Sequence, residues 1–338
     1  MILEIRLANF TYTNRQIHTL ADTERRKRVC KENTGSNAYI GKEDSWTMIA
    51  ENSRAASAGC ALLLAFAAVS VVTAHPDLDR QIRDLTLRIE SDAGNPTLWI
   101  QRGELHRVHR DWDLAESDFL RARKIQPDLD VVDYLLGGMK LEADQPKQAR
   151  KLLDRFLARH PDHAKALVAR ARTYARLDRP LSAAEDYTQA LAAFDRDDQR
   201  PDPAYYLERS RALVAAGPQY AATALNGINE GLARWGPTIT LELHAVELER
   251  TLGRHDAALA RVDRLAAGTN RQETWLVRRG DILVSAGRKA EARAAYGDAV
   301  EAIEALPSSR RASRAMQELG ERARAAIEQL DETATAGM

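Results

Sequence analysis

The sequence predicts an all-α protein in which a pair of helices is repeated along most of the chain. The first observation is a period of 34 residues in small side chains, seen in Ala115, Ala149 and Ala183. The second is the dominance of alanine, leucine, arginine and glutamate after about residue 76, since all four favour helices. The third is that 338 residues contain only 18 glycines and 11 prolines, few for a β-rich protein. A fixed period of this size is typical of stacked structural units.

Length and charge narrow the class of protein. A chain of 338 residues is long enough for two ordinary domains or one repeat array. Hydrophobic residues make up 44% and charged residues 29%, which is ordinary for a soluble protein with a buried interior. The 49 basic and 49 acidic residues cancel, whereas nucleic-acid binders usually carry a basic excess. We therefore expect no nucleic-acid partner.

The N-terminal part differs in composition from the repeats. Residues 55–74 form an uncharged apolar run that follows Arg54, and small side chains stand near its end. This is the layout of a secretory signal peptide, but it begins too far from residue 1. Starting at Met48 would restore the normal distance. We therefore expect residues 1–47 to be an over-extended, disordered gene start and residues 48–74 to be a signal peptide.

The alternative is a cytoplasmic tail followed by an uncleaved membrane anchor at 55–74, because twenty apolar residues can span a bilayer. In either case the part after residue 75 is expected outside the cytoplasm, periplasmic or secreted, or anchored to an envelope membrane. Cys30 and Cys60 both precede it, so a mature domain would have no disulfide and no cysteine nucleophile.

Six copies of the repeat can be aligned. Their small residues fall in two series with a longer interval between the third and fourth copies: Ala115, Ala149, Ala183, Ala224, Ala258 and Ala292. A small residue early in each of two antiparallel helices lets them approach closely, and large side chains such as Phe119 fill the space beside the contact. Pro127 ends the second helix of the first copy because proline cannot continue a helix.

These positions resemble the signature of the tetratricopeptide repeat family. The residues that carry the resemblance are Trp99, Gly103, Ala115, Phe119, Ala122, Pro127, Ala171, Tyr174, Ala183, Tyr187, Ala190, Gly280, Ala292, Tyr296 and Ala299. The resemblance implies a right-handed superhelical solenoid of about six helix–turn–helix repeats. Copies one to three are expected at 95–193 and copies four to six at 204–306, with an insertion loop at 194–203.

Helical caps are expected at both ends, since a solenoid needs half-polar helices to close its exposed ends. Residues 75–94 place Leu78, Ile82, Leu85 and Ile89 on one helical face. Residues 307–332 do the same with a longer apolar series, and 333–338 are expected to be a disordered tail.

No motif in the sequence points to catalysis, a cofactor or a metal. The chain has no glycine-rich phosphate loop, no Gly-x-Ser-x-Gly motif and no His-Glu-x-x-His motif. His106 and His109 would share a helical face, but two histidines make only half a zinc site and no third ligand recurs at a helpful spacing. Packing and surface roles are the favoured interpretation of both.

A ligand groove is the remaining candidate site. In this family the residue after the small position of the first helix faces the concave groove, which places Arg172 and Arg211 there and Arg176 one turn further. Unpaired, they would attract an acidic segment or a C-terminal carboxylate; the alternative is pairing with Glu185, Asp186 or Glu208 within the chain. The apolar groove residues are expected to be Tyr134, Leu141 and Val168. The family's lysine and asparagine carboxylate clamp is absent, because its positions carry Ile100, Glu104, Tyr134, Gly138, Val168 and Arg172.

The sequence therefore predicts a non-catalytic protein–protein interaction scaffold of the cell envelope that binds a protein or peptide in its groove. The alternative is an accessory subunit of an envelope assembly or export machine. An enzyme or a metal-binding protein is the third possibility.

Overall fold

The computed structural model describes residues 76–335, which form α-helices joined by short turns, with one 3₁₀ turn at Pro218–Tyr220 and no β-strand in that range. The predicted all-α solenoid is confirmed. None of the helices in this range is both long and apolar enough to cross a bilayer. The expected gene start at 1–47, the expected signal peptide or anchor at 48–74 and residues 336–338 lie outside the described residues.

Six helix pairs follow a first single helix, α2 (Pro76–Ser91). In chain order they are α3 (Pro96–His109) with α4 (Trp112–Ile125), α5 (Val131–Glu142) with α6 (Pro146–Arg159), α7 (Ala164–Arg176) with α8 (Pro180–Arg196), α9 (Pro203–Ala216) with α10 (Ala221–Trp235), α11 (Ile239–Thr251) with α12 (His255–Ala267), and α13 (Glu273–Ser285) with α14 (Lys289–Glu304). Two helices follow, α15 (Ser308–Arg311) and α16 (Arg314–Thr335). We call the first helix of each pair its A helix and the second its B helix.

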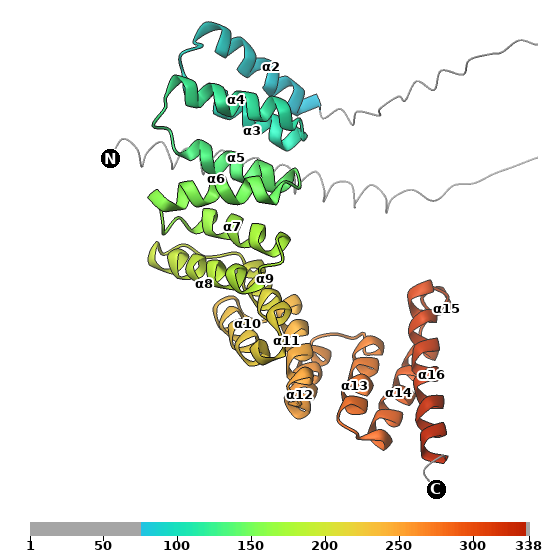
Figure 1. Cartoon of the computed structure of the whole chain (residues 1–338). Helices are drawn as coiled ribbons and strands as arrows, with labels where there is room; N and C mark the ends of the chain where they lie inside the picture. The colour runs from blue at the N-terminus through green and yellow to red at the C-terminus, as the bar shows by residue number, and fades with distance from the viewer. Residues whose placement is uncertain (1–75, 336–338) are drawn as a thin grey trace, which may run out of the picture. The chain divides into compact units, whose positions relative to one another are not determined.

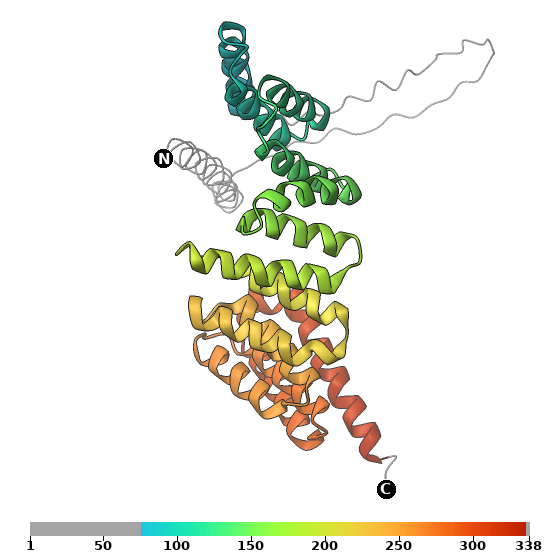
Figure 2. The same ribbon diagram turned by 60° about the vertical axis from the view of Figure 1, so that its left-hand side comes forward.

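Each helix pair packs on its neighbours along the chain, and the pairs of copies one to three follow one another in sequence order (Figure 1). Figure 2 shows the same order from a second direction, with the helices of copies two to four one below another. Contacts between helices two apart also occur, as between α5 and α7 and between α14 and α16. Contacts such as that between α5 and α7 join adjacent copies. The solenoid is thus held by contacts within each copy and between neighbouring copies, as expected of a repeat array.

The close approach of A and B helices depends on small residues, as the sequence predicts. A Cβ atom on Gly103 would lie 2.8 Å from the ring of Phe119, and one on Gly280 would lie 2.5 Å from the ring of Tyr296. Phe119 is fully buried and Tyr296 is 3% exposed. Each glycine therefore makes room for an aromatic ring of its own copy.

The A-to-B turns reuse one backbone conformation. Arg110, Asp144 and Asp178 have φ angles of 70°, 57° and 55°, and Gly253 and Gly287 have 70° and 72°. This left-handed conformation ends the A helix and turns the chain into the B helix. Copy four is different: Gly217 has φ 134° and leads into the 3₁₀ turn at Pro218–Tyr220, so its turn is longer.

The predicted insertion loop at 194–203 is shorter than expected. Helix α8 continues to Arg196 and α9 begins at Pro203, so only residues 197–202 connect them. The reason is Phe194, which is 5% exposed and lies one turn after the fully buried Ala190. The apolar face of α8 therefore extends past the boundary that the polar residues suggested.

The two ends are capped by helices, with two corrections at the C-terminal end. Leu85 and Ile89 of α2 pack against Leu98 and Leu105 of copy one, as predicted. At the other end the expected single helix at 307–332 is broken at residues 312–313, and α16 continues to Thr335, into the segment expected to be a disordered tail. The side chains of α16 that contact the core of copy six are Leu319, Ala323, Ala326, Ile327 and Leu330.

Candidate functional site

The predicted groove residues all lie on A helices. Tyr134 and Leu141 are on α5, Arg172 and Arg176 are on α7, and Arg211 is on α9. All five have solvent-accessible side chains. We call the solvent-facing side of α3, α5, α7 and α9 that carries them the A-helix face.

The prediction for Val168 is wrong. This residue is 3% exposed and belongs to the core cluster that also contains Phe156 and Leu167. A side chain buried in this way stabilises α7 and cannot contact a partner.

Arg172 forms a two-pronged ion pair with a carboxylate of the next copy. Its Nε and Nη2 donate to Glu208 Oε2 and Oε1, each at 2.9 Å. The Tyr187 hydroxyl donates to the same Oε2 at 2.5 Å. The guanidinium also lies over the Tyr205 ring, 5.6 Å from its centroid. Of the two predicted alternatives for Arg172, pairing with Glu208 is the one observed.

This ion pair determines the charge state of Glu208. Burial by itself would raise the pKa of the Glu208 carboxyl, but hydrogen bonds from Arg172 and Tyr187 outweigh it and hold the pKa below its ordinary value. Burial and the same hydrogen bond raise the pKa of the Tyr187 hydroxyl. At neutral pH Glu208 is therefore ionised and Tyr187 protonated.

Similar ion pairs link other neighbouring copies. Arg107 Nη1 donates to Glu142 at 2.5 Å, which ties α3 to α5, and the same guanidinium contacts Glu104 on its own helix. Arg176 Nη1 donates to Asp144 Oδ1 at 2.7 Å. The expected positive patch is therefore neutralised at Arg172 and at Arg176 by carboxylates of adjacent copies.

Arg211 is the predicted groove arginine that has no ion pair or hydrogen bond among residues 76–335. Its charge acts on His244 of α11, whose pKa is lowered, first by burial and then by Arg211. His244 Nε2 lies 2.9 Å from the Ser210 hydroxyl, so a neutral imidazole links α11 to α9.

Two tyrosines give the A-helix face its free polar groups. Tyr134 packs against Phe156 and His163, with ring centroids 5.4 and 5.1 Å apart, and Tyr205 stacks on Phe194 at 5.7 Å. Within the described part of the chain neither hydroxyl has a hydrogen-bond partner, and neither is among the buried unpaired atoms. Both hydroxyls are therefore available to a ligand.

The surroundings of the two tyrosines raise the pKa of each hydroxyl and so keep both protonated. Burial raises the pKa of Tyr134 to about 12, and the nearby Glu104 adds to the effect. Burial is also the main reason that the pKa of Tyr205 is raised. Each tyrosine thus offers an O–H donor on a rigidly packed ring.

Sequence reasoning missed Tyr205 and Glu142, whereas Glu208 was among the predicted partners of the groove arginines. The sequence does contain a signal for the ion pairs, because the oppositely charged residues are separated by about one repeat. The separation is 35 residues for Arg107–Glu142 and 36 for Arg172–Glu208.

The two histidines of copy one lie beside acidic residues. His106 is 8% exposed and lies 3.7 Å from Asp111 and 3.9 Å from Asp118, and burial is the main cause of its lowered pKa. His109 Nδ1 lies 2.8 Å from Asp111 Oδ2. No group of three or more histidine, cysteine or carboxylate side chains suited to a metal ion occurs in residues 76–335.

Comparison with known proteins bears on the fold. Residues 207–319 match the family described as a tetratricopeptide repeat-like domain. No curated protein matches the chain. Among solved structures, a tetratricopeptide repeat protein from Parabacteroides merdae is 15% identical, with 73% of this chain and 93% of that chain covered and a TM-score of 0.45.

Two further solved structures are similar at the same level. The type IV pilus biogenesis factor PilW is 20% identical over 57% of this chain and 86% of its own, with a TM-score of 0.48. PilF of Pseudomonas aeruginosa is 15% identical over 67% and 97%, with a TM-score of 0.47. These values describe a general likeness of helical architecture and say nothing about a partner. Residues 207–319 thus match a tetratricopeptide repeat-like domain, and they overlap an all-α array of helix pairs that runs from residue 96 to residue 304.

Proposed function

We propose that this protein is a non-catalytic scaffold of the cell envelope that binds a partner protein or peptide across the A-helix face of copies one to four. The observation that carries the proposal is the pair of tyrosines, Tyr134 and Tyr205. Each ring is fixed by aromatic packing, and each hydroxyl is a donor without a partner among the described residues. Rigid aromatic side chains with one free polar group are the residues that most often carry binding energy at protein interfaces.

The charges around these tyrosines argue for a partner that is not strongly acidic. Arg107, Arg172 and Arg176 are each paired with a carboxylate, which leaves Arg211 as the unpaired predicted arginine. A bound peptide would therefore be oriented by hydrogen bonds to the tyrosine hydroxyls and by apolar contacts with Leu141, with a smaller contribution from Arg211.

The location outside the cytoplasm rests on the apolar run at 55–74, and it stays a proposal. An accessory subunit of an envelope assembly or export machine remains the alternative form of the same activity. Co-purification as a stable, stoichiometric complex would favour the subunit over a scaffold that binds transiently.

A photo-crosslinking experiment tests the proposed face. A benzophenone amino acid is placed at Tyr205 and, as a control, at Leu120, which is 46% exposed on the B helix α4. We expect one discrete crosslinked partner from Tyr205 in intact cells and none from Leu120. The Tyr134→Phe variant should reduce that crosslink, because it keeps the ring and removes the hydroxyl that would donate a hydrogen bond to the partner. Identical crosslinks from both positions would refute the proposed face.

A further inference from the structure

Two adjoining cavities lie at the junction of copies three and four. The first is about 490 Å³ and lies between the turn that starts α8 and the end of α9, and the second is about 460 Å³ and lies between α8, α9 and α10. They share Leu181, and both are open to solvent rather than enclosed. We call them together the junction channel, defined by Asp178, Leu181, Glu185, Arg209, Leu213 and Glu230. None of the tyrosines or paired arginines of the A-helix face lines it.

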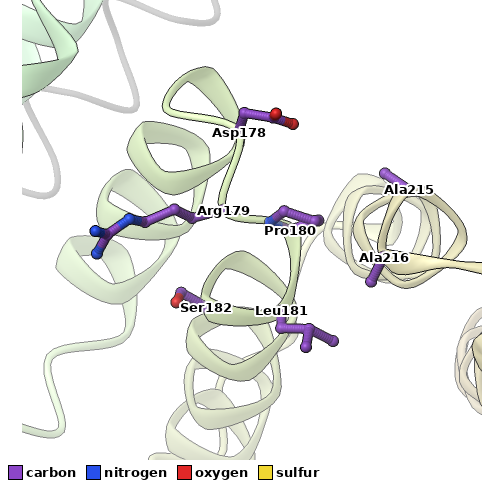
Figure 3. A pocket seen from close by; sticks show the side chains of 7 residues that line it. All are labelled: Asp178, Arg179, Pro180, Leu181, Ser182, Ala215 and Ala216. Carbon is purple, nitrogen blue, oxygen red and sulfur yellow. The ribbon is translucent and has the colours of Figure 1, made fainter.

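The middle of the channel is apolar and exposed. Leu181 is 49% exposed, and in Figure 3 its side chain points toward the end of α9, where Ala216 lies. Leu213 of α9 lines the second cavity and is half-buried. A leucine this exposed at the joint of two cavities is an apolar contact available to a ligand.

Each cavity also has one carboxylate without a partner. Asp178 lines the first cavity and Glu185 the second, and neither forms an ion pair or hydrogen bond through its side chain among residues 76–335. In Figure 3 Asp178 lies on the side of α9, whereas Arg179 extends in the opposite direction, away from the cavity. Arg179 therefore does not neutralise Asp178.

The one arginine that faces the second cavity is already neutralised. Arg209 is 8% exposed, and its Nη2 donates to Glu230 at 2.5 Å. The charged residues that line the channel are thus the Arg209–Glu230 pair, Asp178, Glu185 and Arg179, whose guanidinium extends away from it. The channel is an apolar centre between two free negative charges.

We infer that the junction channel binds a short partner segment in which an apolar side chain is flanked by two basic side chains. The apolar side chain contacts Leu181 and Leu213, and the two cations pair with Asp178 and Glu185. Lysine and arginine suit these positions because their aliphatic stems pack on apolar surface while the charged head stays at the carboxylate. This site lies apart from the proposed A-helix face and does not depend on it.

The affinity of such a site depends on salt. Exposed ion pairs contribute little each and are screened at high ionic strength. Binding is therefore expected to be weak, stronger at low salt, and dependent on both the cations and the apolar residue of the segment.

The experiment uses the full chain and a dye-labelled, N-acetylated and C-amidated peptide with a Lys-Leu-Lys core. Binding is followed by fluorescence anisotropy at low and high salt. The Asp178→Asn, Glu185→Gln double variant should weaken binding by about five-fold, as expected from the loss of two exposed ion pairs. Asparagine is chosen at 178 because the backbone there has φ 55°, which asparagine tolerates.

A matched control removes the same charge elsewhere. Glu301→Gln with Glu321→Gln takes two exposed carboxylates from α14 and α16, and it should leave peptide binding unchanged. A peptide with norleucine in place of each lysine should bind more weakly to the unaltered protein, and a peptide with glutamate should not bind.

Equal weakening by the two double variants would overturn the inference, because it would show attraction by net charge alone. Equal binding of the glutamate peptide would also overturn it. Failure of the Tyr205 crosslink would refute the A-helix face and leave this result intact, so the two proposals fail separately.

Discussion

The guanidinium of Arg209 lies directly against Gly227 of the neighbouring helix, so closely that a Cβ atom on Gly227 would lie 2.5 Å from Nη2. Copies one and three have an aspartate at the position equivalent to Gly227, and there Arg102 pairs with Asp118 and Arg170 with Asp186. In copy four the glycine lets the arginine pass over α10 and reach Glu230 instead. The same A-helix arginine is thus neutralised in two different ways.

This relationship predicts that Arg209 changes its ion-pair partner in the Gly227→Asp variant. The introduced carboxylate should recreate the pairing of copies one and three and draw Arg209 away from Glu230. Glu230→Gln should therefore cost less stability in the Gly227→Asp background than in the unaltered protein, where Arg209 would be left without its partner. Urea unfolding of the four proteins of this cycle gives the coupling. Equal costs in the two backgrounds would show that Arg209 does not switch.

Copy two predicts the outcome of replacing the Arg102–Asp118 pair. At the equivalent positions it carries Leu136 and Leu152, an apolar pair. Asp118→Leu alone should destabilise the protein by about 3 kcal/mol, because Asp118 is 3% exposed and Arg102 would lose its carboxylate. The double variant Arg102→Leu, Asp118→Leu should recover most of that loss. Chemical denaturation measures both, and a double variant as unstable as the single one would contradict the prediction.

Two glycines of copy six should respond to alanine with opposite signs. Gly280→Ala places a methyl group 2.5 Å from the stiff Tyr296 ring and should destabilise the protein by about 1–3 kcal/mol. Gly297 lies within α14 with nothing within 4 Å of its Cβ position, so Gly297→Ala should stabilise by about 0.5–1 kcal/mol through helix propensity. Melting temperatures that move in the same direction would argue against this packing.

Phe119→Ala should lower the free energy of unfolding more than Trp99→Ala does. Phe119 is fully buried, and its loss should cost about 3–5 kcal/mol. Trp99 is only half-buried, and part of its contribution is an indole hydrogen bond to the Ala93 carbonyl at 3.1 Å. Because each copy contacts its neighbours, hydrogen exchange in Phe119→Ala should rise first in copy one. An equal rise in copy six would exclude such local loosening.

The ion pair of Glu208 predicts a pH dependence of stability. The folded pKa of Glu208 lies below its ordinary value of 4.5, so its contribution is fully present above that pH and is lost as the pH falls through the folded pKa. Glu208→Gln should therefore be destabilising near neutral pH, and the difference from the unaltered protein should shrink on acidification. Arg172→Ala should show the same convergence, whereas Arg211→Ala should stay within about 0.5 kcal/mol throughout. If the difference in stability between Glu208→Gln and the unaltered protein stayed constant with pH, the ionisation of Glu208 would not be linked to folding.

The period of the sequence was enough to predict the helix pairs, because each copy repeats the same small and aromatic contacts within one pair of helices. The ends of α8 and α16 were not predictable in the same way. Each depends on a few apolar residues, such as Phe194, that continue a buried face through a polar stretch.

The candidate site was predicted less well than the fold. The groove-facing positions of the tetratricopeptide repeat family placed Arg172, Arg176 and Arg211 on the A-helix face. They could not show which of these arginines would pair with a carboxylate. Arg172 reaches Glu208 across the junction between copies three and four, which is five residues longer than the repeat requires, since the equivalent arginines Arg170 and Arg209 are 39 residues apart. Val168 was misplaced because a one-residue rotation on a helix separates the core from the surface.

The placement of the buried ion pairs has a consequence for how such an array can change over generations. Arg102 and Asp118 belong to the same copy, as do Arg170 and Asp186, and copy two replaces both members together with leucines. A gene duplication or deletion that moves one whole 34-residue unit therefore carries each of these charges together with its counter-ion. The Arg172–Glu208 pair spans a unit boundary, so an exchange at that boundary would leave one of the two ions stranded. The Arg107–Glu142 and Arg176–Asp144 pairs cross the boundaries of copy two in the same way, so the pairs within a copy are the ones that an exchange of whole units preserves.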